Sequence, residues 1–112
     1  MPNTPIQDMA LGQLRDAVEQ LKALAATTTD RDIYAAANDS EAQMQSRIST
    51  LLNLQLARDT AAMQAQTDRI SATKSAFDSA VKNIAVANDI VTGTAKFLGA
   101  VDILIKVATR IA

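Results

Sequence analysis

The fold is decided by residues 56–105, LARDTAAMQAQTDRISATKSAFDSAVKNIAVANDIVTGTAKFLGAVDILI, in which an apolar side chain returns at every seventh position. The series comprises Leu56, Met63, Ile70, Phe77, Ile84, Val91, Leu98 and Ile105. Seven residues are close to two turns of an α-helix, so this recurrence keeps one apolar seam facing a partner helix. The pattern predicts an all-α protein with a coiled-coil-like seam.

On either side of this seam the sequence predicts further helices, and we expect a single helical domain over residues 1–112 that contains three helices. Residues 40–91 contain no glycine or proline and are rich in good helix formers, which predicts one long central helix. Apolar residues at three- and four-residue spacing predict an earlier helix over residues 5–26, with Pro5 at its first position. Residues 27–39 are then a polar linker, in which Asp30 could supply an N-cap, and residues 95–111 form the last helix.

The predicted central helix is too long for a compact chain of this size. At 1.5 Å per residue it would extend for about 78 Å, whereas a compact domain of this size has a radius of gyration of about 13 Å. We therefore expect an elongated helical hairpin or a three-helix arrangement, unless the chain folds back near residues 67–75. Gly93 is the predicted hinge before the last helix, although a helix that runs through this position is also compatible with the sequence.

Two surfaces are candidates for function. The first is an interface with another helix, made of Leu52 and the seam: Leu52, Leu56, Met63, Ile70, Phe77, Ile84, Val91, Leu98 and Ile105. The second is the broad apolar face of residues 95–111, flanked by lysine and arginine, where Phe97, Val101 and Leu104 are possible membrane-facing residues. Packing against protein is the commoner fate of such a face.

The composition favours association with a protein partner over binding to nucleic acid. Apolar residues make up 48% of the 112 residues, but aromatic residues only 3%, so a lone chain would bury little area in its core. Assembly into a homo-oligomer or with a helical partner would supply the missing contacts. Eleven basic against twelve acidic residues give a net charge of -1, which lacks the cationic excess that binding to phosphates requires.

The residue types needed for most enzymatic chemistry are missing. The sequence has no histidine and no cysteine, which excludes Ser-His and Cys-His nucleophiles, thiolate metal sites and disulfides. The acidic pairs Asp30/Asp32 and Asp39/Glu41 fall in expected polar linkers, where no apolar pocket would raise a carboxyl pKa. We expect no enzymatic activity, no catalytic, cofactor-binding or metal-ligating residue, and no cofactor.

The sequence predicts neither a signal peptide nor a transmembrane segment. The first residues lack a basic charge, and residues 84–112 carry too many charges for a membrane-spanning helix. The expected location is the cytoplasm, or the outside of the cell after export by a non-classical route.

Three functions are compatible with these observations. The first is a non-enzymatic structural or interaction protein, a self-assembling subunit of a filament, secretion apparatus or phage particle that packs through the heptad seam. The second is a membrane-active protein that uses its amphipathic C-terminal helix. The third is a compact helical adaptor or an immunity-type binder.

Overall fold

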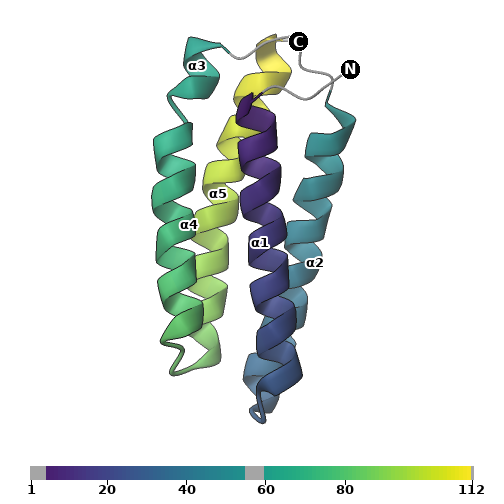
Figure 1. Ribbon diagram of the computed structural model, residues 1–112, viewed down its shortest axis with the longest axis vertical. Helices are drawn as coiled ribbons and strands as arrows, with labels where there is room; N and C mark the ends of the chain where they lie inside the picture. Colours follow the sequence, from purple (N-terminus) through teal and green to yellow (C-terminus); the bar gives the residue numbers. More distant parts are fainter. Residues whose placement is uncertain (1–4, 55–59, 112) are drawn as a thin grey trace.

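The computed structural model describes residues 5–54 and 60–111 and shows an all-helical bundle (Figure 1). Its described residues form four long helices and one short one: α1 (Pro5–Thr27), α2 (Arg31–Asn53), α3 (Ala61–Gln64), α4 (Thr67–Lys82) and α5 (Ala87–Ile111). No strand occurs among these residues. The expected all-α class is confirmed, whereas the expected three-helix arrangement is wrong.

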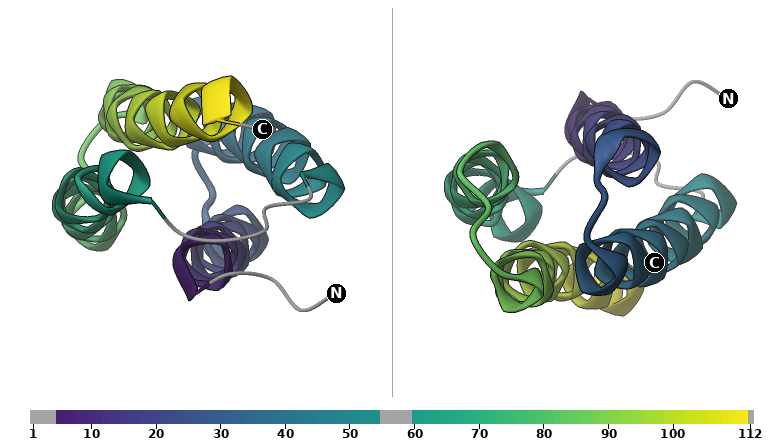
Figure 2. Two further views of the ribbon diagram at one scale, coloured as in Figure 1. Left: turned by 90° about the horizontal axis from the view of Figure 1, so that it is seen from above. Right: turned by 90° about the horizontal axis from the view of Figure 1, so that it is seen from below.

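The bundle consists of two antiparallel hairpins, α1–α2 and α4–α5, packed against each other (Figures 1 and 2). Seen end-on, α1 lies beside α2 and α4, and α5 lies beside the same two helices, so that α2 and α4 occupy opposite corners. The turns at residues 28–30 and 83–86 lie at one end of the bundle, which we call the loop end. This topology makes α1 parallel to α4, and α2 parallel to α5.

The turn between the first two helices is much shorter than the sequence suggested. The predicted first helix is confirmed to within a residue at each end, but the linker over residues 27–39 is reduced to residues 28–30. The Asp30 side chain caps α2 by accepting hydrogen bonds from the backbone N–H groups of Asp32 and Ile33, at 2.8 Å and 3.1 Å. The expected start of the next helix at residue 40 is also wrong, because Ser40 is buried in the middle of α2.

The predicted long helix over residues 40–91 is wrong, and so is a fold-back within residues 67–75. The chain leaves the helical conformation at Leu54 and reverses direction at residues 83–86 instead. Asn83 ends α4, and its side-chain amide donates a hydrogen bond to the Ser79 carbonyl at 3.2 Å. Asp89 then accepts hydrogen bonds from the backbone N–H groups of Ala85 and Val86, which otherwise have no helical partner.

A single apolar core fills the space between the helices. The largest fully buried side chains come from all four long helices and include Leu14, Leu21, Met44, Leu51, Ile70, Phe77, Ile90, Phe97 and Leu104. The rings of Phe77 and Phe97 pack with their centroids 6.1 Å apart, which joins α4 to α5. The radius of gyration is 14.3 Å and the longest extent is 45 Å, so the bundle is much shorter than the expected single helix of about 78 Å.

Gly93 lies inside α5, and the predicted hinge at this position is wrong. None of the described glycines has a positive φ, so Gly93 does not end a helix in the left-handed conformation. A Cβ atom placed on it would lie 3.5 Å from the Ala80 Cβ and 3.7 Å from the Phe77 Cα. The small residue therefore lies where α5 approaches α4 closely.

Candidate interaction surfaces

The heptad residues face inward rather than toward another molecule. Met63, Ile70, Phe77 and Leu98 are buried in the core, and Ile84 and Ile105 are partly buried against it. Val91 is the exception, since 52% of its surface is exposed. Leu52 is also exposed, whereas Leu56 lies outside the described residues. Most of the predicted interface is therefore buried in the core of one chain.

The three possible membrane-facing residues also belong to the core. Phe97 and Val101 are completely buried, and Leu104 is almost so. The wide apolar face of α5 is covered by α2 and α4, its neighbours in the bundle. These side chains could meet a bilayer only after α5 had left the bundle. Among the described residues, no helix has the length and apolar character needed to cross a membrane.

A buried lysine lies between α1 and α4. The Lys74 ammonium is 2.7 Å from the Asp16 carboxylate and 2.5 Å from that of Asp78, while only 8% of the lysine side chain is exposed. The Gln20 amide donates hydrogen bonds to the same two carboxylates, at 2.8 Å and 2.7 Å. One turn further along, the Gln13 amide donates to the Ser71 hydroxyl at 3.4 Å. We call the set Gln13, Asp16, Gln20, Ser71, Lys74 and Asp78 the polar seam.

The polar seam shifts the pKa values of Asp16 and Lys74. Hydrogen bonds from Lys74 and Gln20 lower the pKa of Asp16 below its ordinary value. Burial by itself would lower the pKa of Lys74, but the hydrogen bonds to Asp16 and Asp78 outweigh it and raise that pKa. The lysine is therefore charged in the folded protein, and the two carboxylates compensate its loss of water.

Sequence reasoning missed the polar seam, although part of its signal was present. Lys74 follows Ile70 by four residues and precedes Phe77 by three, which places a cation on the buried face of α4. Asp16 and Gln20 are likewise four residues apart on α1. What the sequence could not reveal is that α1 and α4 are neighbours, because 58 residues separate Asp16 from Lys74.

The opposite pair of parallel helices, α2 and α5, is linked by one ion pair at its edge. The Arg47 guanidinium donates two hydrogen bonds to the Asp102 carboxylate, at 2.9 Å and 3.0 Å. This bidentate contact raises the pKa of Arg47. Both side chains are partly exposed, so the pair contributes little to the stability of the fold.

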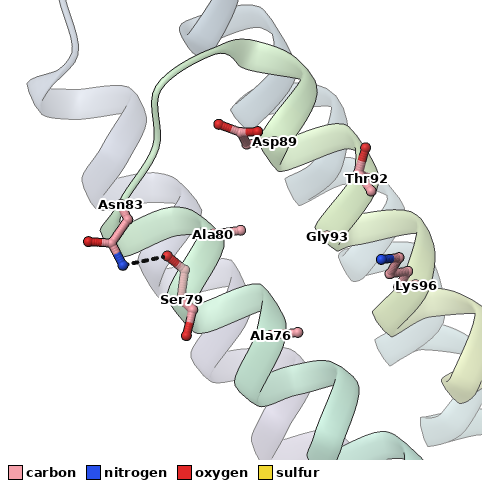
Figure 3. Close-up of a pocket in the computed structure, with 8 residues that line it drawn as sticks. All are labelled: Ala76, Ser79, Ala80, Asn83, Asp89, Thr92, Gly93 and Lys96. Carbon is pink, nitrogen blue, oxygen red and sulfur yellow. Dashed lines mark hydrogen bonds between the residues drawn. The ribbon is translucent and has the colours of Figure 1, made fainter.

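Two shallow grooves open on the surface between helices. One, of about 450 Å³, lies between α4 and α5 and is drawn in Figure 3. Small side chains form its floor, and its polar lining includes Asn83, Asp89 and Lys96. The other groove, of about 410 Å³, lies between α1 and α4, where Leu24 and Val81 are among its lining residues. Both grooves are nearer to the loop end than to the end where the described chain begins.

Three of the four large apolar side chains that are exposed among the described residues lie toward the loop end. The four are Tyr34, Leu52, Val86 and Val91, each about half exposed. Tyr34 lies in the first turn of α2, Val86 directly precedes α5, and Val91 lies in the second turn of α5. Leu52 is at the other end of α2, about 27 Å from Tyr34 at 1.5 Å per residue.

The described residues contain no cluster of three or more potential metal-ligating side chains among histidine, cysteine, aspartate and glutamate. Comparison of the chain with protein-family models, with curated proteins and with solved structures finds no match.

Proposed function

We propose that this chain is a non-enzymatic helical interaction protein, a compact adaptor-type module that binds a protein partner through its loop end. The observation that carries the proposal is the position of Tyr34, Val86 and Val91, three of the four large apolar side chains exposed on the described surface. Tyrosine is enriched at protein interfaces because it buries a large area while its hydroxyl group can still bond to water or partner. The two grooves toward the same end add concave surface.

The burial of the heptad seam favours an adaptor over a self-assembling subunit. Ile70, Phe77 and Leu98 are already removed from water by their own chain, so no second copy is needed to cover them. The absence of histidine and cysteine from the sequence supports the non-enzymatic part of the proposal. The membrane-active alternative has no comparable support, because its apolar residues lie in the core.

Site-specific photo-crosslinking tests this proposal. A photoreactive phenylalanine analogue replaces Tyr34 at the loop end or, as a matched control, Leu52 at the far end of the same helix. Both residues are exposed to the same extent, and both lie on α2. In cells that produce the protein, the probe at residue 34 should yield a defined adduct with a second protein, whereas the probe at residue 52 should yield much less of it.

Light scattering on the purified chain completes the test. We expect the measured mass to be that of a monomer at every protein concentration. A stable oligomer, with adducts at residue 34 only to a second copy, would contradict the adaptor proposal and favour the self-assembling subunit.

A further inference from the structure

The two interfaces between the hairpins differ in chemistry. The α2–α5 interface is the more extensive, and apolar side chains of both helices, such as Met44 and Val101, are buried in the common core. The hydrogen bonds and ion pairs between α1 and α4 join Gln13 to Ser71, Asp16 to Lys74, and Gln20 to Asp78. All three connect residues 58 positions apart, so the polar seam follows two parallel helices for about two turns.

A polar interface costs less to open than an apolar one of the same size. When α1 and α4 separate, their carboxylates and amides regain hydrogen bonds with water, so the net loss per bond is small. Separation of α2 from α5 would break a single ion pair at the edge, Arg47–Asp102, and would expose the larger apolar contact area at about 25 cal/mol per Å². The weaker of the two contacts between the hairpins is therefore the polar seam.

The topology leaves the loop end of this seam without a covalent connection. At the loop end α1 continues into α2, and α4 continues into α5, so no turn joins α1 to α4 there. The chain passes from one hairpin to the other only at the opposite end, between α2 and α3. The groove that Leu24 and Val81 line already lies between α1 and α4, on the loop side of Lys74.

We propose that the polar seam is a latch, in which Lys74 with its two carboxylate partners holds α1 against α4, and that its release lets the hairpins separate from the loop end about the α2–α5 interface. Lys74 is the central element because it is the most buried charged group of the seam and is held from both helices. Without Asp16 and Asp78 it would be an unpaired buried charge, which the chain avoids by admitting water between α1 and α4. This inference stands on the contacts of the seam and does not depend on the proposed partner.

Pulsed electron spin resonance can measure the separation directly, because a chain without cysteine accepts spin labels at chosen positions. One labelled pair, Ala23→Cys and Lys82→Cys, spans the groove between α1 and α4. The control pair, Asp39→Cys and Ala95→Cys, uses exposed positions on α2 and α5. Each pair is studied in three backgrounds: the otherwise unchanged chain, the double variant Asp16→Ala/Asp78→Ala, and that variant with Lys74→Met added.

In the otherwise unchanged chain we expect one narrow distance distribution for each pair. The double variant should add a second, longer population to the 23–82 pair and leave the 39–95 pair unchanged. Lys74→Met removes the unpaired charge, so it should restore the single narrow distribution. The latch is refuted if the double variant leaves the 23–82 distances unchanged. It is equally refuted if both pairs broaden together, because the bundle would then lose its structure as one unit.

Discussion

Gly93 and Lys74 have roles that depend on what faces them in the bundle. Gly93 is one of three glycines inside long helices, and it is the one whose missing side chain faces another helix. Lys74 occupies a position of α4 between two core residues, yet it is charged because Asp16 of α1 and Asp78 of α4 accept its hydrogen bonds. At this scale, the neighbour across the interface decides whether a residue stabilises the fold.

Replacement of Gly93 by alanine should stabilise the protein by roughly 1 kcal/mol. Alanine has the higher helix propensity, and its Cβ would meet Ala80 and Phe77 at ordinary contact distances of 3.5 to 3.8 Å. The urea midpoint of unfolding measures the change. Gly99→Ala, where a Cβ would meet nothing within 4 Å, is the matched control and should give a similar gain. Loss of stability at Gly93 alone would mean that the two helices pack too tightly there for a methyl group.

The ion pairs of Lys74 should make stability depend on pH at both ends of the scale. The pKa of Asp16 lies below 3.8 in the folded chain, so its contribution is complete above pH 3.8 and disappears as the pH falls through the lowered pKa. The pKa of Lys74 lies above 10.5, so its contribution is complete below pH 10.5 and disappears as the pH rises through the raised pKa.

Lys74→Met should therefore flatten the dependence of the free energy of unfolding on pH below pH 3.8. Urea titrations at a series of pH values measure it. Lys22→Met removes the same charge from an exposed position of α1 and should leave the steep acid dependence in place. Equal slopes for the unchanged chain and Lys74→Met would show that the pair does not control the acid transition.

The helices end where side chains offer hydrogen bonds to free backbone groups. Asp30 starts α2, Thr60 starts α3 by accepting a hydrogen bond from the Met63 N–H at 3.2 Å, and Asp89 reaches back to the residues before α5. At the far end of α2, the buried Gln7 side chain donates to the carbonyls of Leu51 and Leu54. These side chains shorten the helices that composition alone would allow to continue.

Removal of the α2 cap should cost about 1 kcal/mol, the usual value for an aspartate N-cap replaced by alanine. Asp30→Ala leaves the N–H groups of Asp32 and Ile33 without their side-chain acceptor. Thermal unfolding followed by circular dichroism measures the loss. Asp30→Asn keeps a side-chain oxygen at the same position and should remain close to the unchanged protein. If asparagine proved as harmful as alanine, capping would not be the cause.

The whole molecule uses the heptad seam within one chain. Two hairpins, joined by parallel contacts of α1 with α4 and of α2 with α5, bury the seam residues that a coiled coil would have shared between chains. The resulting bundle measures 45 × 22 × 18 Å, less than the roughly 78 Å that the predicted central helix alone would have required.

Truncation of a seam residue should consequently weaken a monomer rather than separate an oligomer. Phe77→Ala should lower the free energy of unfolding by about 3–5 kcal/mol, the range for a buried phenylalanine, because Phe77 is completely buried. The unfolding temperature should not depend on protein concentration, either for the unchanged protein or for Phe77→Ala. Tyr34→Ala, at an exposed site, should change stability by less than about 0.5 kcal/mol. An unfolding temperature that rises with concentration would place the seam between molecules.

Local sequence pattern was enough to predict the helical class, the start of α1 at Pro5, the cap at Asp30 and the apolar seven-residue series that includes Met63, Ile70 and Phe77, but not that this series is buried within one chain. These features depend on local chemistry, since periodicity, capping and propensity act within a few residues of one helix. That Gly93 lies inside a helix and that Val91 is exposed could not be derived in this way. A helix that continues and a helix that turns back can keep the same heptad spacing.

Only the tertiary structure decided that the chain turns at residues 83–86, that α1 lies beside α4, and that Lys74 is paired across them. The reason is that the turn at Asn83 lets Phe77 and Phe97 bury each other, and this burial offsets the free-energy cost of ending the helix. The two phenylalanines are far apart along the chain, so no local sequence pattern reveals that they will pack together. Residues far apart in the sequence, such as Asp16 and Lys74, come into contact only after the two hairpins have packed against each other.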